Sequence, residues 1–235
     1  MLSSTNKSFL LLDGKPIISY SLQLFQKHSK IDTILIVMHS DWIKEVMHWV
    51  NQLGITKAKQ VVVGGKERQD SIRLAMDALK ELHPKENDIV LVHNAVNPLV
   101  TDAMVSECIL AAELHQASVI GYRVKDTIRR VEESGKSIET LNRKELWGMQ
   151  TPQCIQYDLF RRAHEQAWKE GFYGTDDVQL VERIGVKPMV VDGGYENIKI
   201  TTPEDIKFAE SILKNRKEKE EKREREDRKK TEEGK

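Results

Sequence analysis

Strand-like and helix-like segments alternate along most of this chain. The segment from Ile31 to Met38 is almost continuously apolar, as expected for a strand covered on both faces, and Asp41 to Leu53 repeats apolar residues at helical spacing. The alternation continues with strands expected at 60–63, 88–93 and 117–124 and helices expected at 67–82 and 101–116. Repeated β-α-β units of this size predict an α/β fold, with a Rossmann-like, mostly parallel sheet and helices on both faces.

The alternation is interrupted between residues 126 and 147, where short polar pieces surround Ser134-Gly135. We interpret this stretch as an excursion from the body, a hairpin arm. A helix is expected again at 157–170, followed by short strands at 189–191 and 197–200. The last helix has a clear start signal, because Thr202 suits the N-cap, Pro203 the first helical position and Asp205 the capping-box acid.

The apolar face of this last helix ends near Lys214. Residues 216–235 consist largely of Lys, Arg and Glu and contain no large apolar side chain, so they cannot add to a core. Opposite charges spaced by four residues could extend the helix, and a frayed tail is the alternative. We therefore divide the chain into one domain, 1–213, and a charged helical or disordered tail, 214–235. Acids nearly balance bases in the tail, so a role in contacting RNA is weakly supported.

Composition narrows the class of protein further. The chain has 235 residues, enough for one large domain, and its 37 Lys plus Arg equal its 37 Asp plus Glu. This balance favours neither nucleic acid nor an anionic membrane as partner. No apolar run is long enough to span a bilayer, the first residues do not resemble a signal peptide, and Cys108 and Cys154 lack metal or disulfide spacing. A cytoplasmic location is expected.

Four segments carry residues that suit chemistry. A Gly-Gly turn at 64–65 precedes a helix, where backbone N–H groups could meet a ligand, although such a turn is more often only a turn. The segment 93–98 follows a strand at the edge where open α/β sheets bind ligands, although its Asn residues could simply cap the next helix. The third segment comprises 124–128, 143–147 and 150–153. The fourth, 195–205, places Lys199 before a capped helix, where it could meet a phosphate or remain an ordinary surface lysine.

In this order, the segments resemble one family, the 2-C-methyl-D-erythritol 4-phosphate cytidylyltransferases, over about residues 1 to 213. Members carry a Gly-Gly-x-x-Arg-x-x-Ser turn, an Asp-Ala-Ala-Arg-Pro loop, a Val-Lys-Asp-Thr strand end, an Arg before Leu-Trp, a Gln-Thr-Pro-Gln turn, a Thr-Asp-Asp helix start and an Asn-Ile-Lys-Ile-Thr-Thr-Pro-Glu-Asp ending. The ending is matched at 197–205 and Thr-Asp-Asp at 175–177. Ribitol 5-phosphate cytidylyltransferases share much of this layout, and Val-Lys-Asp-Thr at 124–127 favours the methylerythritol branch.

The resemblance implies a nucleotide-diphospho-sugar transferase type of fold and an enzyme of non-mevalonate isoprenoid biosynthesis. Such an enzyme joins CTP to 2-C-methyl-D-erythritol 4-phosphate, releases pyrophosphate and uses Mg²⁺. The attacking phosphate is already an anion, so catalysis is expected to rest on positioning and on cations.

The resemblance also assigns residues to roles. It implies catalytic lysines at Lys7 and Lys199. The nucleotide contacts it implies are Gly64, Gly65, Lys66, Ser71, Asn94 and Ala95, with Asn94 also at the metal position. The substrate contacts it implies are Asn97, Thr127, Arg143, Thr175 and Thr201. The 126–147 arm matches one that embraces a second subunit, which implies a homodimer with sites completed across the interface.

The chain departs from the family pattern in several places. Met1 aligns with the Met that ends the family's Gly-rich phosphate loop, so the strand and loop before it are missing from the match. We expect a truncated form of a longer product, such as a late start codon would give, with 1–235 unstable by itself. Asn94 replaces a metal-binding Asp, Asn97 replaces an Arg, and Asn6 and Ser8 replace the Pro and Gln beside the lysine. An alternative is therefore an impaired paralogue acting as a dimerising or regulatory partner.

Overall fold

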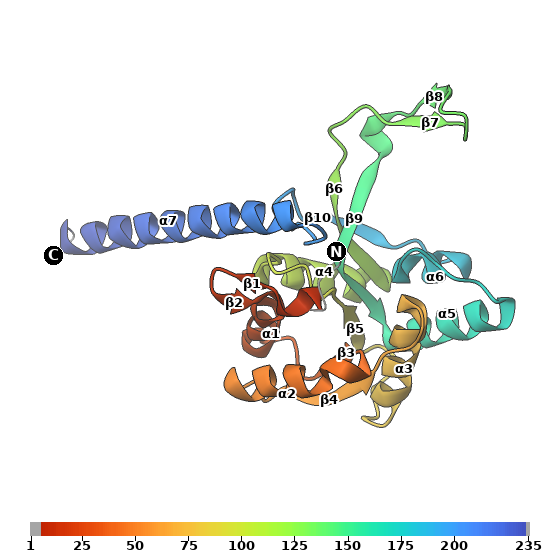
Figure 1. Cartoon of the computed structure of the whole chain (residues 1–235), viewed down its shortest axis with the longest axis horizontal. Helices are drawn as coiled ribbons and strands as arrows, with labels where there is room; N and C mark the ends of the chain where they lie inside the picture. The colour runs from red at the N-terminus through yellow and green to blue at the C-terminus, as the bar shows by residue number, and fades with distance from the viewer. Residues whose placement is uncertain (1–5, 234–235) are drawn as a thin grey trace.

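The computed structural model describes residues 6–233, which form an α/β body, a projecting hairpin arm and a long C-terminal helix (Figure 1). Met1, on which the alignment with the Gly-rich loop depends, lies outside the described residues. The α/β fold class is confirmed: strands and helices alternate along the body, and helices cover both faces of its largest sheet.

The largest sheet has four strands in the order β10-β6-β9-β5. Its strands are β5 (Ile89–Val92), β6 (Ala117–Arg123), β9 (Trp147–Gln156) and β10 (Met189–Asp192). β10 is parallel to β6, whereas β9 is antiparallel to both of its neighbours. The expectation of a turn at residues 150–153 is therefore wrong, because hydrogen bonding to β5 and β6 on either side extends this segment into the long strand β9.

A second, parallel pair is formed by β3 (Ile34–Met38) and β4 (Ala58–Val63). It confirms the strands expected at 31–38 and 60–63, although in the described residues it forms a separate two-stranded sheet. Near the N-terminus, the short strands β1 (Leu11–Leu12) and β2 (Lys15–Pro16) form a small hairpin that leads into α1 (Ile17–Lys27). This N-terminal hairpin and helix were not predicted.

Alternation along β6 and β9 divides the core into two sides. Ile120 and Cys154 pack with α1, α2 (Ile43–Gln52) and α4 (Asp102–His115), while Val119 and Ile155 pack with helices on the opposite face. The helices on that opposite face are α3 (Arg68–Lys80), α5 (Tyr157–Glu170) and α6 (Asp177–Arg183). Successive strand residues point to opposite faces, so helices on both sides of the sheet explain why the first five residues of β6 are all buried.

The expected strand at 197–200 is wrong, because this segment is irregular. Its backbone is held by single contacts rather than by a ladder: the Ile200 N–H donates to the Val96 carbonyl at 2.8 Å. The buried side chain of Asn197 donates to the Thr151 carbonyl at 2.9 Å. These contacts anchor the segment against the loop after β5 and the middle of β9.

The last helix, α7 (Pro203–Glu233), begins as the sequence predicts. The Asp205 carboxylate accepts hydrogen bonds from the backbone N–H groups of Thr201 and Thr202, each at 2.8 Å. The charged segment continues as helix to Glu233 and extends away from the body (Figure 1). Arg216 pairs with Glu196 at 3.0 Å and Lys217 pairs with Asp13, so the first half of this helix contacts the body.

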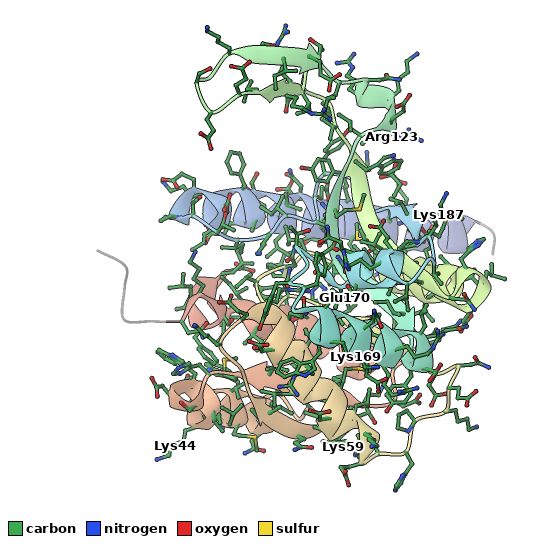
Figure 2. The ribbon with its side chains drawn as sticks, turned by 90° about the vertical axis from the view of Figure 1, so that its right-hand side faces the viewer. Lys44, Lys59, Arg123, Lys169, Glu170 and Lys187 are labelled. Atoms are coloured by element: carbon green, nitrogen blue, oxygen red, sulfur yellow. The ribbon has the colours of Figure 1, made fainter. Side chains whose placement is uncertain are left out.

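The predicted arm is a hairpin of β7 (Arg129–Val131) and β8 (Ser137–Thr140), followed by a short 3-10 turn, Arg143–Glu145. It projects from the body beyond the ends of β6 and β9, and Arg123 lies at its base (Figure 2). Within residues 6–233, no helix combines the length and hydropathy that crossing a membrane would require.

Candidate active site

A cavity of about 520 Å³ opens beside the ends of β5, β6 and β10. Four predicted site residues line it together: Asn94, Asn97, Thr175 and Lys199. They come from three segments far apart in the sequence, and the cavity lies where ligands bind in open α/β sheets, at the carboxyl ends of parallel strands. Ten further residues line it: Arg68, Tyr122, Met149, Gln150, Thr151, Gln153, Asp176, Tyr195, Asn197 and Ile198.

The loop after β5 is fixed by a short hydrogen-bond chain through His93. The Asn94 N–H lies 3.3 Å from Thr151 Oγ1, which lies 3.1 Å from His93 Nδ1, and His93 Nε2 lies 3.0 Å from the Asn97 carbonyl oxygen. A carbonyl can only accept, so Nε2 carries the proton and Nδ1 accepts from the threonine hydroxyl. Burial lowers the pKa of His93 to about 4, which keeps the ring neutral and this arrangement intact near neutral pH.

Two asparagines of this loop face one another inside the cavity. Asn94 Nδ2 donates to Asn97 Oδ1 at 3.2 Å, and the Asn97 N–H donates to the Asn94 carbonyl at 3.0 Å. Asn94 therefore keeps its side-chain oxygen available to a ligand, whereas Asn97 is buried and its oxygen is used within the loop. Ala95, predicted to contact nucleotide, lies in the same loop but does not line the cavity.

An ion pair closes one wall. Arg68, the first residue of α3, binds Asp177 through both guanidinium Nη atoms, with Nη1 3.0 Å from Oδ1. Burial raises the pKa of the Asp177 carboxyl, and the Arg68 guanidinium opposes that rise. Gln153 completes the wall by accepting from the N–H groups of Asp177 and Val178 at 3.0 and 3.1 Å. The Arg68 charge in the cavity is thus largely neutralised within the protein.

Of the two predicted catalytic lysines, Lys7 and Lys199, one lines the cavity and the other contacts the segment next to it. Lys199 lines it directly. Lys7 does not, but its Nζ donates to the Thr201 carbonyl at 2.7 Å, two residues from Lys199. Thr201, a predicted substrate contact, directs its hydroxyl to Asp205 at 2.8 Å instead of into the cavity.

Asn197 is a site residue that sequence reasoning missed. Its side chain is fully buried and lines the cavity, yet Oδ1 has no hydrogen-bond partner among the described residues. An unpaired buried acceptor is costly, so a ligand donor at this position would be stabilising. Asn197 is the first residue of the 197–205 motif, and this position could have identified it as a candidate site residue.

The predicted nucleotide contacts Gly64, Gly65, Lys66 and Ser71 lie around the start of α3 and do not line the cavity, although Arg68 between them does. The Gly65 N–H donates to Ser71 Oγ at 3.0 Å, and a Cβ on Gly65 would lie 2.5 Å from the Cβ of Asp70. Only glycine therefore fits at position 65. Lys66 is exposed, and Gly64 donates to the Met38 carbonyl at 2.9 Å. The turn is tightly built, as the sequence suggests for backbone that approaches a ligand.

Thr127 and Arg143, predicted substrate contacts, lie on the arm and do not line the cavity. Arg143 Nη1 donates to the Lys125 carbonyl at 2.8 Å. Tyr195 joins the arm base to the cavity, because its hydroxyl donates to the Arg123 carbonyl at 2.6 Å while its ring lies 3.4 Å from Lys125 Nζ. Within one subunit, these two substrate contacts are therefore apart from the other predicted site residues.

The cavity offers few ligands for a divalent cation. No cluster of three or more His, Cys, Asp or Glu side chains able to hold a metal occurs in the described part of the chain. Asp176 is the carboxylate of the cavity lining, and its oxygens already accept from the Gln179 N–H and Gln153 Nε2 at 3.0 and 3.1 Å. Asn94 contributes a neutral oxygen. This set does not fit Mg²⁺ held by protein groups, since Mg²⁺ binds through one or two carboxylates together with substrate phosphates.

Comparison with known proteins adds independent findings. The family model described as IspD, 2-C-methyl-D-erythritol 4-phosphate cytidylyltransferase, matches residues 1–215. Curated proteins of that name are similar: the one from Clostridium novyi is 40% identical over 92% of this chain and 91% of its own length, and the one from Clostridioides difficile is 43% identical over 92% and 89%.

Solved structures agree. The 4-diphosphocytidyl-2C-methyl-D-erythritol synthase of Anaerococcus prevotii is similar with a TM-score of 0.79 and 28% identity, covering 89% of this chain and 90% of its own. The 2-C-methyl-D-erythritol 4-phosphate cytidylyltransferase of Thermus thermophilus is similar with a TM-score of 0.73 and 27% identity, over 88% of this chain and 94% of its own.

Proposed function

The chain belongs to the 2-C-methyl-D-erythritol 4-phosphate cytidylyltransferase family, and we propose that the cavity beside Lys199 is where it performs the transfer. It is an enzyme that joins CTP to 2-C-methyl-D-erythritol 4-phosphate, giving 4-diphosphocytidyl-2-C-methyl-D-erythritol and pyrophosphate, in non-mevalonate isoprenoid biosynthesis. The names of the relatives given above mention neither ribitol phosphate nor a non-catalytic role.

One observation carries the location of the site. Three segments that match family motifs, at 93–98, 175–177 and 197–205, meet in this one cavity. Its volume of about 520 Å³ lies within the range of about 300–1,000 Å³ typical of small-molecule sites. Arg68 lines the cavity and lies in the chain between Lys66 and Ser71, so the turn with Gly64 and Gly65 is next to the cavity. We assign the cytosine of CTP to this turn and the phosphates to the side of the cavity that carries Lys199.

The reaction needs little from the protein except position and positive charge. A phosphate oxygen of the sugar-alcohol phosphate attacks the α-phosphorus of CTP, a new P–O bond forms, and the bond to the β-phosphate breaks with its electron pair leaving on pyrophosphate. The attacking phosphate, the α-phosphate and the departing pyrophosphate are all negatively charged and lie close together in this step. Lys199 and Lys7 therefore stabilise the charge that develops on the transferred and leaving groups. The hydrogen bond from Lys7 to the Thr201 carbonyl holds Lys7 against the segment that carries Lys199.

A homodimer would bring the arm residues to a site. Thr127 and Arg143 lie outside the cavity lining of their own subunit. The arm also exposes apolar side chains: Val131 is 54% and Ile138 55% exposed. We propose that each arm embraces a second copy of the chain and delivers Thr127 and Arg143 to the partner's cavity, where Asn97 and Thr175 contribute the remaining substrate contacts.

A divalent cation, where one takes part, would be held mainly by the phosphates of CTP. The protein group most similar to the oxygen ligands that Mg²⁺ prefers is the side-chain amide oxygen of Asn94, which is uncharged. The positive charge that the chain itself supplies comes from its lysines, so we assign charge stabilisation to Lys7 and Lys199.

The proposal is tested by pyrophosphate release from CTP with methylerythritol phosphate or, in parallel, ribitol 5-phosphate. Release is expected with the first substrate. Lys199→Ala is expected to reduce it at least about a hundredfold, as loss of a charge-stabilising group typically does. Lys187→Ala, an exposed lysine on the surface (Figure 2), is the matched control and should leave the rate unchanged. Equal effects of the two variants, or preference for ribitol phosphate, would contradict the proposal.

A further inference from the structure

A second cavity, of about 200 Å³, lies between α3 and α5, outside the candidate active site. Residues of α3 line one side, including Gln69 and Arg73, and residues of α5 line the other, including His164 and Trp168. Phe172 and Tyr173 in the following loop close one end. None of these residues lines the first cavity. A water molecule takes up about 30 Å³ in the liquid, so this space exceeds what a few solvent molecules need.

Two of the residues that line this cavity each carry a buried nitrogen atom with no hydrogen-bond partner among the described residues. They are Nε of Arg73 and Nε2 of His164. His164 is only 5% exposed, and its ring packs against Phe160 with the centroids 4.6 Å apart. Buried polar atoms are nearly always paired, and an unpaired one costs free energy. An acceptor supplied by a ligand in the cavity would be stabilising if it reached these two nitrogen atoms.

The charges around the second cavity indicate the charge of the ligand that it would bind. Arg73 lies with its guanidinium carbon 4.8 Å from the Trp168 ring centroid, and its Nη1 pairs with Asp77 at 3.3 Å, which leaves Nε directed elsewhere. Burial, followed by the positive charges of Arg73 and Arg68, lowers the pKa of His164 to about 4. The imidazole is therefore neutral near pH 7 and sits in a positive potential, which favours an anionic acceptor.

The remaining lining restricts where such an anion binds. Asp70 also faces the cavity, but it caps α3 by accepting from the Glu67 N–H and it accepts from the Tyr173 hydroxyl at 3.2 Å. A negative group would therefore bind at the Arg73 and His164 end. Ala167 and the half-open ring of Trp168, 63% exposed, offer apolar surface for the rest of the ligand.

We propose that this second cavity binds a small molecule that carries an oxyanion, a carboxylate or a phosphate, on a compact apolar body. The oxyanion accepts hydrogen bonds from Arg73 Nε–H and from His164 in its Nε2–H form, and the apolar body packs on Trp168. The site is joined to the first cavity by Gln69, which donates to the Phe172 carbonyl at 2.8 Å and accepts from the Gly174 N–H at 2.9 Å. Gly174 directly precedes Thr175, so an occupant contacts the loop that shapes the active site.

Benzoate and phenyl phosphate serve as probes of the two oxyanion classes, and benzyl alcohol as the neutral control. The full chain is labelled with ¹⁵N-tryptophan, and the Trp168 indole signal is identified by its loss in Trp168→Phe. We expect a saturable shift of Trp168 with benzoate, with phenyl phosphate or with both, and a much smaller one with benzyl alcohol. The probe that binds more tightly identifies the class of ligand. The Lys199→Ala variant should keep the shift, because it alters only the first cavity.

Variants test the assigned donors. Arg73→Gln and His164→Phe are each expected to weaken probe binding at least about tenfold, as the loss of a charge-assisted or buried hydrogen bond does. Asp77→Asn is the matched control, since it removes the partner of Arg73 but leaves Nε in place. The indole signals of Trp42, Trp49 and Trp147 show whether each variant remains folded.

Two results would overturn the proposal. One is the absence of a saturable Trp168 shift with both anions up to about 10 mM, beyond the millimolar range in which so small a ligand should bind. The other is binding that Arg73→Gln and His164→Phe, both folded, leave unchanged. Neither outcome depends on catalytic turnover, so the site can fail while the proposed function stands.

Discussion

Asn94 places an amide at the position where the family motif has an aspartate. This single change removes one negative charge from the cavity. Asn94 Nδ2 donates to Asn97, which leaves one neutral oxygen toward the cavity. Asn94→Asp would add a carboxylate, the ligand type that Mg²⁺ prefers. We expect the Mg²⁺ concentration for half-maximal pyrophosphate release to fall about tenfold, equivalent to about 1.4 kcal/mol.

Asn142→Asp is the control for this change, because it adds the same charge on the exposed arm turn. The magnesium dependence of both variants is measured by titration at fixed CTP. An Asn94→Asp enzyme with the dependence of the starting protein would show that position 94 does not meet the cation.

His93 should make stability depend on pH. Burial lowers its pKa from 6.5 to about 4, so the unfolded chain takes up a proton at higher pH than the folded chain does. The stabilisation is therefore complete above about pH 6.5 and is lost as the pH falls to about 4; it amounts to about 3 kcal/mol, because each pKa unit corresponds to about 1.4 kcal/mol. His164 is shifted in the same direction and adds to the slope.

Urea unfolding at pH 7, 5.5 and 4.5 measures this slope. His93→Gln should flatten it, because glutamine can donate to the Asn97 carbonyl without titrating. His48→Gln, at an exposed histidine, should not. An unchanged slope in His93→Gln would mean that His93 is not the group responsible.

The site residues that the sequence predicted share one property. Asn94, Asn97, Thr175 and Lys199 lie in short linear motifs next to element boundaries, so their position could be inferred from neighbours in the chain. Thr151 and Gln153 lie in the segment 150–153, which the sequence also singled out, but their neighbours in the chain do not reveal what the two side chains do. Their roles, holding His93 and the start of α6, depend on β9 running antiparallel between β5 and β6, a pairing across distant segments.

At the scale of elements, local signals predicted the helices better than the strands. The capped start of α7 and the apolar stripes of α2 and α4 depend on residues within a few positions of one another. β9 was expected to contain a turn and 197–200 to be a strand, because strand identity depends on a partner that local sequence does not specify. The α1 helix was missed, although its buried face includes Ile18, Leu22 and Phe25.

The charged half of α7 should contribute little to stability. Arg216 is anchored, since its guanidinium donates to the Leu99 carbonyl at 2.9 Å and pairs with Glu196 at 3.0 Å. Ending the chain after Lys219 should leave the free energy of unfolding within about 0.5 kcal/mol of the full chain, as expected for exposed surface. Arg216→Ala should lower it by about 1–2 kcal/mol through the lost hydrogen bonds.

Both free energies come from urea unfolding at pH 7. A shortened chain that loses as much stability as Arg216→Ala would contradict this account and would assign the tail a contact with the body.

At the scale of the whole molecule, the proposed dimer predicts complementation between two inactive subunits. Lys199→Ala removes a residue of the cavity, and Arg143→Ala removes one on the arm. If the arm acts in the partner's cavity, a mixed dimer has one site with both changes and one site with neither. Subunits mixed equally should then recover about a quarter of the starting activity, since about half of the dimers are mixed and each has one intact site.

Val131→Glu on both subunits is the matched control, because it should prevent the arm from packing on a second copy and abolish the recovery. Light scattering should then give a mass near 27.1 kDa, that of one chain, instead of twice that value. Recovery that never exceeds the sum of the two separate variants would show that the arm does not complete the partner's site.

The transfer itself is tested most directly by the fate of a labelled phosphate. With CTP labelled at the α-phosphorus and methylerythritol phosphate, the label should move into the diphosphate that links cytidine to the sugar alcohol, while unlabelled pyrophosphate is released. The Lys199→Ala variant should slow both events together. Label that remains in CTP, or that appears in a nucleoside monophosphate or inorganic phosphate, would contradict the account.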